Sequence, residues 1–138
     1  MKIAFFDTKP YDKTYFDKYS NEYGMTIKYY ETKLNEDTVQ LAQGYDVVCA
    51  FVNDTVNAKV IDNLNDIGIN VLALRCAGFN NVDMQYAYGK LHVLRVPAYS
   101  PYAVAEHTMA LLLTSVRRIH KAFIRSKEFN FSLSGLTG

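Results

Sequence analysis

Short apolar stretches recur along the chain up to residue 96, and their composition is typical of β-strands. They are four to six residues long and rich in β-branched or aromatic side chains, which favours extended structure. The stretches at 3–6, 47–51 and 71–74 are apolar almost throughout, as in strands buried on both faces of a parallel sheet. The stretch at 25–30 alternates more and is expected at an edge. A fifth strand is predicted at 91–96.

The segments between these strands have the period of helices, with an apolar residue at every third or fourth position. The period is clear in two segments and weaker in a third: Tyr11, Tyr15, Phe16 and Tyr19; Val56, Val60, Ile61, Leu64 and Ile67; and Val39, Leu41 and Ala42. A glycine follows each segment shortly before the next strand, where a left-handed residue ends a helix: Gly24, Gly44, Gly68 and Gly89. Unless these are four unrelated loop glycines, the alternation predicts an α/β fold with a flavodoxin-like, doubly wound sheet of five parallel strands.

A different pattern begins at Ser100, which is suited to cap a helix whose first residue is Pro101. No helix-breaking residue follows until about Phe129, so we predict one long helix over 101–129, about 40 Å in length. Its apolar residues supply more than one face. A helix of this length exceeds the thickness of the small domain before it, so we expect part of it to contact a second domain or a second copy of the chain. A homo-oligomer is expected through this helix.

Composition narrows the class of protein. The chain has 138 residues, of which 49% are hydrophobic and 21% charged, as in a soluble globular domain. Its net charge of +1 gives no support to a nucleic-acid or membrane-surface role. No apolar run reaches the roughly 18 residues of a membrane span. Cys49 and Cys76 each lie in an apolar run, which predicts core thiols in a reduced, cytoplasmic protein and no metal site.

Ligands of open α/β sheets bind beyond the carboxyl ends of the strands, and the turn after the fourth strand is the most informative of these ends. Ala77 and Gly78 are small, so a ligand can approach the backbone closely. Asn80, Asn81 and Asp83 are expected to open a short helix whose free N–H groups attract a carboxylate or phosphate. The alternative is a glycine needed only for a tight turn with positive φ.

Two longer segments carry a resemblance to a known family. Residues 75–83, Arg-Cys-Ala-Gly-Phe-Asn-Asn-Val-Asp, resemble the substrate loop of the NAD-dependent D-2-hydroxyacid dehydrogenases. Residues 96–107 and 117–120 resemble the domain-crossing segment of that family, and the similarity is greatest to its lactate-forming members. The resemblance implies a substrate-binding domain at 1–100, a domain-crossing or dimerisation helix at 101–129 and a linker at 130–138.

The same resemblance implies which parts of such an enzyme the chain lacks. The family has a Gly-x-Gly-x-x-Gly dinucleotide turn, and no glycines here match that spacing. We therefore expect the Rossmann cofactor domain, with the family's catalytic Arg, Glu and His, to lie beyond this chain. Arg75 and His107 are not their equivalents: a local ion pair is expected for Arg75 and a structural helix position for His107.

The resemblance also implies roles for particular residues. The backbone N–H groups of Ala77 and Gly78 would hold the carboxylate of a small 2-keto or 2-hydroxy acid, and Phe51 would contact the methyl group of pyruvate. Tyr99 would reach the same carboxylate, unless it is only a half-buried strand-end tyrosine. Val104 would touch the nicotinamide of NAD. The implied reaction is hydride transfer between NADH and pyruvate, and the chain alone is expected to be inactive.

Two other functions are compatible with the sequence. Asp7 and Asp54 follow the first and third strands, as in phosphoacceptor signalling domains. Such domains also need a hydroxyl after the fourth strand and a lysine after the fifth, where Cys76-Ala77 and Pro97-Ala98 stand instead. The second alternative is a non-catalytic module that self-associates through the helix from Pro101.

Overall fold

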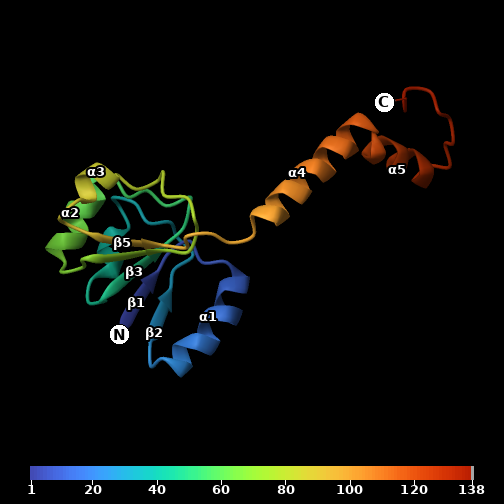
Figure 1. Ribbon diagram of the computed structural model, residues 1–138. Helices are drawn as coiled ribbons and strands as arrows, with labels where there is room; N and C mark the ends of the chain where they lie inside the picture. The colour runs from blue at the N-terminus through green and yellow to red at the C-terminus, as the bar shows by residue number, and fades with distance from the viewer. Residues whose placement is uncertain (138) are drawn as a thin grey trace. The chain divides into compact units, whose positions relative to one another are not determined.

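The computed structural model describes residues 1–137, which divide into two compact units. The first unit, Met1–Pro97, alternates strands with helices (Figure 1). Its elements in order are β1 (Lys2–Phe5), α1 (Pro10–Glu22), β2 (Thr26–Tyr29), the 3₁₀ turn η1 (Val39–Ala42), β3 (Val47–Ala50), α2 (Ala58–Asp66), β4 (Val71–Leu74), α3 (Met84–Ala87) and β5 (His92–Arg95). The second unit begins at Ala98 and contains α4 (Pro101–Val116) and α5 (Ile119–Lys127).

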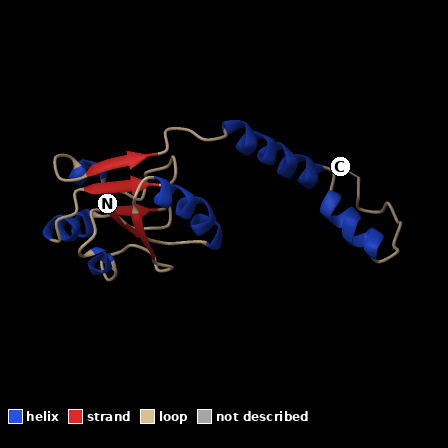
Figure 2. Ribbon diagram, turned by 90° about the horizontal axis from the view of Figure 1, so that it is seen from below, coloured by secondary structure: helices blue, strands red, loops and turns tan. Residues whose placement is uncertain are grey.

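The five strands form one parallel sheet in the order β2-β1-β3-β4-β5. Figure 2 shows the strands lying side by side in red. Phe5 of β1 is in register with Tyr29 on one side and with Cys49 on the other. The doubly wound parallel sheet is confirmed, and β2 lies at an edge as its alternating pattern predicted. Because the chain leaves β1 in one direction and returns past it to β3, the carboxyl ends of β1 and β3 flank the switch point.

Successive side chains at the end of β1 and just beyond it point to opposite faces of the sheet and meet different helices. The Phe5 ring meets Phe16 of α1 edge-on, with the ring centroids 4.9 Å apart. Phe6 instead joins the main core, to which α2 contributes Val60, Ile61 and Leu64. Helix α2 begins where Asn57 accepts the N–H of Val60 at 3.1 Å, a typical N-cap.

The segments between the strands follow the sequence pattern to different degrees. The predicted α1 is present, but Tyr11, Tyr15 and Tyr19 are exposed, and the helix contacts the sheet through Phe16. The weakly periodic segment forms only the short turn η1. Gly24, Gly44, Gly68 and Gly89 all have positive φ, between 62° and 85°, which confirms their predicted left-handed conformation before each strand.

The prediction of a single helix over 101–129 is wrong, because the structure has two helices there, α4 and α5, with a break between them. Arg118 has φ of +50°, a left-handed conformation that an α-helix does not accommodate. The Arg118 guanidinium donates to the carbonyl of Gly135 at 2.7 Å. The carbonyls of Ser132 and Ser134 accept from Arg125 of α5, so residues 132–135 fold back beside that helix. Within residues 1–137, no helix is both long and apolar enough to cross a membrane.

Candidate functional site

The guanidinium of Arg75, which follows β4, lies at the carboxyl edge of the sheet. Its central carbon is 4.4 Å from the ring centroid of Phe5 and 4.5 Å from that of Phe51. Nη2 donates to the backbone carbonyl of Asp7 at 2.6 Å, and Nε lies 3.6 Å from a carboxylate oxygen of Asp12. The Arg75 side chain is only 9% exposed. These contacts confirm a local ion pair for Arg75 and tie the end of β4 to the end of β1.

Asp7 is the second buried charge of this edge. It has φ of +48° and a side chain that is 2% exposed, with Oδ1 bound to the Lys9 ammonium at 2.7 Å. In the part of the chain that the structure describes, Oδ2 of Asp7 and Nη1 of Arg75 are buried without a hydrogen-bond partner. The sequence pattern did not distinguish this cluster, because its members come from four separate positions.

Asp54 holds the loop that follows β3. One carboxylate oxygen accepts the N–H of Phe51 at 2.6 Å, and the other accepts the N–H of Leu34 at 2.7 Å. Burial raises the pKa of Asp54 above its ordinary value, and the two N–H donors oppose that shift. Because both oxygens are occupied and the residue is only 2% exposed, Asp54 is not placed to accept a phosphoryl group. This geometry contradicts the phosphoacceptor alternative.

Asn81 connects the loops that follow β3 and β4. Its Nδ2 donates to the carbonyl of Phe51 at 2.9 Å and to the carbonyl of Asp54 at 3.0 Å. The backbone carbonyl of Asn81 accepts a hydrogen bond from the N–H of Val56 at 2.9 Å. Asn81 was expected only to help open a helix, so this connection between two loops was missed. An asparagine near a loop glycine is too common a pattern to predict it.

The turn at residues 76–79 has carbonyls that accept hydrogen bonds and amides that are free. The carbonyl of Cys76 accepts from the N–H of Val96 at 3.2 Å, that of Ala77 from Arg95 Nη1 at 3.0 Å and that of Gly78 from the Cys76 thiol at 3.3 Å. Within residues 1–137, the N–H groups of Ala77 and Gly78 donate to no other group of the chain. The turn therefore presents two unused donors.

Gly78 itself is open to solvent. A Cβ added there would meet nothing within 4 Å, and Gly78 is not among the glycines with positive φ. The tight-turn alternative is therefore wrong for Gly78. Its lack of a side chain leaves space above the free amides, as a close-approaching ligand requires.

The expectation of an anion site at the start of α3 is wrong. Helix α3 has four residues, and the Asp83 carboxylate already accepts the N–H of Tyr86 at 3.0 Å. A carboxylate from the chain itself thus takes the position that a ligand anion would need. The two free donors lie earlier in the loop, at Ala77 and Gly78.

Two further candidates, Tyr99 and Val104, lie in the second unit. Their side chains are 65% and 57% exposed, so both are accessible to a ligand. Phe51, Ala77 and Gly78 belong to the first unit. Their roles stay predictions.

The two cysteines are free and buried, as predicted. Burial raises the pKa of the Cys49 thiol to about 12 and raises that of Cys76 as well. Both thiols are therefore protonated and unreactive at neutral pH. Across the described residues, no group of three or more His, Cys, Asp or Glu side chains is arranged to hold a metal ion.

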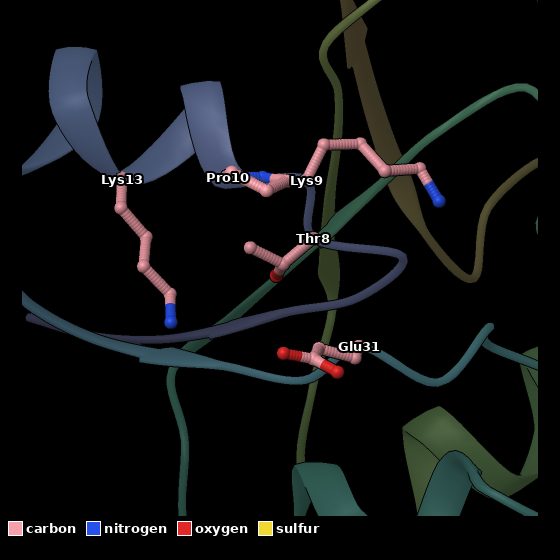
Figure 3. Close-up of a pocket in the computed structure, with 5 residues that line it drawn as sticks. All are labelled: Thr8, Lys9, Pro10, Lys13 and Glu31. Carbon is pink, nitrogen blue, oxygen red and sulfur yellow. The ribbon is translucent and has the colours of Figure 1, made fainter.

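A surface pocket of about 510 Å³ lies beside the start of α1. Figure 3 shows the residues that line it, Thr8, Lys9, Pro10, Lys13 and Glu31. In that view the Lys9 side chain points away from Glu31, and its ammonium is paired with Asp7. The N–H of Lys9 is bound by the Asp12 carboxylate at 2.8 Å. The pocket includes no predicted site residue, and its helix start is already capped by the chain.

The fold and the free loop amides define a doubly wound α/β domain with a candidate site at the carboxyl end of its sheet. Residues 3–134 match the family model of the D-isomer specific 2-hydroxyacid dehydrogenase, catalytic domain. The chain therefore belongs to this family.

Individual relatives support the same assignment. The chain is 50% identical to a 2-hydroxyacid dehydrogenase homolog of Haemophilus influenzae and 46% identical to the D-lactate dehydrogenase of Escherichia coli, each over 139 residues. These alignments cover all of this chain and 42% of each relative. The apo-structure of the E. coli D-lactate dehydrogenase superposes with a TM-score of 0.86 at 46% identity, covering 100% of this chain and 44% of that one.

A more distant solved structure was determined in an NAD-complexed form. It is the D-isomer specific 2-hydroxyacid dehydrogenase of Lactobacillus delbrueckii ssp. bulgaricus, which is 28% identical to this chain and superposes with a TM-score of 0.71. The superposition covers 100% of this chain and 42% of that one. The chain thus spans less than half the length of the relatives it matches.

Proposed function

We propose that this chain is the substrate-binding part of an oxidoreductase that transfers a hydride between NAD(H) and a small 2-keto or D-2-hydroxy acid, with pyruvate and D-lactate as the pair. Family membership and the similarity to D-lactate dehydrogenases support the reaction class. The observation that carries the assignment of the site is the pair of unused N–H donors at Ala77 and Gly78.

Two adjacent backbone donors suit the carboxylate of such an acid. Hydrogen bonds to an ionised acceptor are shorter and stronger than those between neutral groups. The open space above Gly78 allows the carboxylate to reach both N–H groups without a clash. The Tyr99 hydroxyl would donate to the same carboxylate, since it is exposed on the segment before α4.

Phe51 would limit the size of the acid. Its ring follows β3 and packs against the Arg75 guanidinium, so a substrate methyl group would meet the ring and a longer side chain would clash with it. A contact of this kind discriminates between acids that differ by a methylene by roughly 10- to 200-fold. This supports pyruvate over larger 2-keto acids.

The role proposed for this chain in cofactor binding is limited to Val104. This exposed apolar side chain of α4 fits contact with one face of a nicotinamide ring. When bound, NAD supplies the hydride chemistry, while the residues of this chain bind and orient the acid. Since no catalytic residue is proposed here, we expect the chain alone to show no NADH oxidation with pyruvate and to bind NAD weakly or not at all.

A titration of the ¹⁵N-labelled chain tests the site. Pyruvate or the analogue oxamate should shift the amide signals of Ala77 and Gly78, whereas pyruvamide, which lacks the carboxylate, should shift them far less. Activity is tested in a chimera in which the chain replaces the matching part of the E. coli enzyme, and NADH-dependent pyruvate reduction is the expected result. Unmoved signals at residues 77 and 78 would overturn the proposed site, and measurable activity of the chain alone would overturn the proposed division of roles.

Self-association is the second proposed property, and α4 is the observation that favours it. The helix has no buried residue in this chain, and Leu111, Leu112 and Leu113 are all more than half exposed. An apolar surface of this kind is typical of an interface. We propose that a second copy of the chain covers it, and that the protein works in the cytoplasm, where its two free thiols stay reduced. A module that only self-associates would dimerise without any shift at residues 77 and 78.

A further inference from the structure

We propose that Asn81 and Asp54 are positioning residues that set the distance between the Phe51 ring and the amides of Ala77 and Gly78, and thereby the length of acid that fits. This inference rests on the proposed function, in which the amides hold the carboxylate and the ring meets the other end of the substrate. Neither Asn81 nor Asp54 would touch the substrate. Each acts through the backbone of Phe51.

The backbone of Phe51 is held at both its N–H and its carbonyl group. Its N–H donates to the Asp54 carboxylate at 2.6 Å, and its carbonyl accepts from Asn81 Nδ2 at 2.9 Å. Strand β3 ends at Ala50, so Phe51 is the first residue beyond it. The side chains of Asp54 and Asn81 therefore supply the hydrogen bonds that a neighbouring strand no longer provides. A residue held at both groups cannot rotate without breaking a hydrogen bond.

The ring of Phe51 also packs against another side chain. The Phe51 ring lies against the Arg75 guanidinium, whose carbon is 4.5 Å from the ring centroid. Arg75 is itself bound to the carbonyl of Asp7 and is nearly buried. The backbone of Phe51 is thus held by two side chains, and its ring packs against a nearly buried guanidinium.

Asn81 belongs to the loop that carries the amides of Ala77 and Gly78. It lies three residues after Gly78, and its side chain bonds to both Phe51 and Asp54 of the neighbouring loop. Its carbonyl accepts the N–H of Val56, and the N–H of Asp83 donates to the Val56 carbonyl, each at 2.9 Å. Four hydrogen bonds therefore join the two loops, and in this proposal they set the gap between the ring and the amides.

The alternative is that Asn81 and Asp54 only stabilise the fold. In that case their replacement would weaken the binding of every 2-keto acid by the same factor. If they set the gap, replacement changes the preference between a short and a long acid. The ratio of two dissociation constants separates these cases, because a general loss of stability cancels from it.

Asn81→Asp is the sharpest variant. It keeps the shape of the side chain but replaces the Nδ2 donor with an oxygen that faces two carbonyls. Asn80→Asp is its matched control, because it makes the same change of charge at the neighbouring, exposed position. If Asn81→Asp does not fold, Asp54→Asn takes its place, since the amide retains one acceptor oxygen but not both.

The experiment titrates the full ¹⁵N-labelled chain with pyruvate and with 2-oxopentanoate, and follows the amide signals of Ala77 and Gly78. We expect the unaltered chain to prefer pyruvate, Asn81→Asp to reduce this preference about tenfold, and Asn80→Asp to leave it unchanged. If pyruvate does not shift these signals in the unaltered chain, the proposed function fails and this inference with it. If pyruvate binds but the preference is the same in Asn81→Asp, only this inference is overturned.

Discussion

The guanidinium carbon of Arg75 lies 4.5 Å from the centroid of the Phe51 ring. An arginine beside a candidate substrate-binding residue could be taken for a catalytic residue. The other contacts of Arg75, however, are structural ones with Phe5, Asp7 and Asp12 of the same unit. Arg75 thus joins the ends of β1, β3 and β4 and packs against the Phe51 ring. Its role is to hold the edge of the sheet together.

We expect Arg75→Met to destabilise the first unit strongly. The substitution keeps much of the side-chain volume but leaves the nearly buried Asp12 carboxylate without its cation, which costs about 3 kcal/mol. Urea unfolding followed by circular dichroism measures the change. Lys59→Met is the control, since Lys59 is 70% exposed in its ion pair with Glu36, and the loss should stay below about 1 kcal/mol. Equal losses in the two variants would contradict this account.

The glycines at 78 and 68 should respond differently to alanine. Gly78 has no positive φ and no atom within 4 Å of an added Cβ, so Gly78→Ala should leave the free energy of unfolding unchanged or raise it by a few tenths of a kcal/mol. The new methyl group should still weaken pyruvate binding by crowding the free amides. Gly68 has φ of +85°, and Gly68→Ala should destabilise the chain by about 1 kcal/mol without a selective effect on binding. Thermal unfolding and the pyruvate titration together test both claims.

Stability should fall at alkaline pH because the folded chain keeps protons that the unfolded chain releases. The pKa of Cys49 rises from 9.0 to about 12 through burial, and that of Tyr30 rises from 10.0 to about 12 through burial and its hydrogen bond to Tyr45. Both groups contribute stability that is fully present below pH 9 and is lost between about pH 9 and 12 as the unfolded chain ionises.

The measurement is the urea-unfolding free energy at a series of pH values. Tyr30→Phe removes one of the two groups and should make the fall between pH 10 and 12 shallower. Tyr88→Phe serves as the comparison, because it makes the same substitution at a tyrosine that is 90% exposed. A stability that is flat over this range would contradict the effect of burial on these two groups.

Self-association through α4 should depend on its apolar surface. Leu112 is 52% exposed, and Leu112→Glu would place a charge in the proposed interface. We expect sedimentation equilibrium to give a dimer for the unaltered chain and a shift to monomer for the variant, with unchanged helix content. Glu106→Gln, on the same helix, changes the charge without adding one to the leucine surface and should remain dimeric. A monomer at high concentration for the unaltered chain would refute the proposal.

The sequence alone was sufficient for the fold of the first unit, because each of its signals is local. The apolar runs at β1, β3 and β4 indicate strands covered on both faces, and Gly24 and Gly68 indicate helix ends through their backbone freedom. The resemblance of the 75–83 segment to the 2-hydroxyacid dehydrogenases is also contiguous in sequence, and the family model confirms it.

Other features depend on residues far apart in sequence, and only the tertiary structure decided them. Hydrogen bonds from Asn81 to Phe51, 30 positions away, and from Arg75 to Asp7, 68 positions away, exist because parallel strands bring distant ends to one edge. The break at Arg118 escaped the sequence pattern because arginine is a good helix former, and its left-handed conformation is accompanied by a hydrogen bond to Gly135. Local propensity thus determined the elements, while chain topology determined which side chains meet.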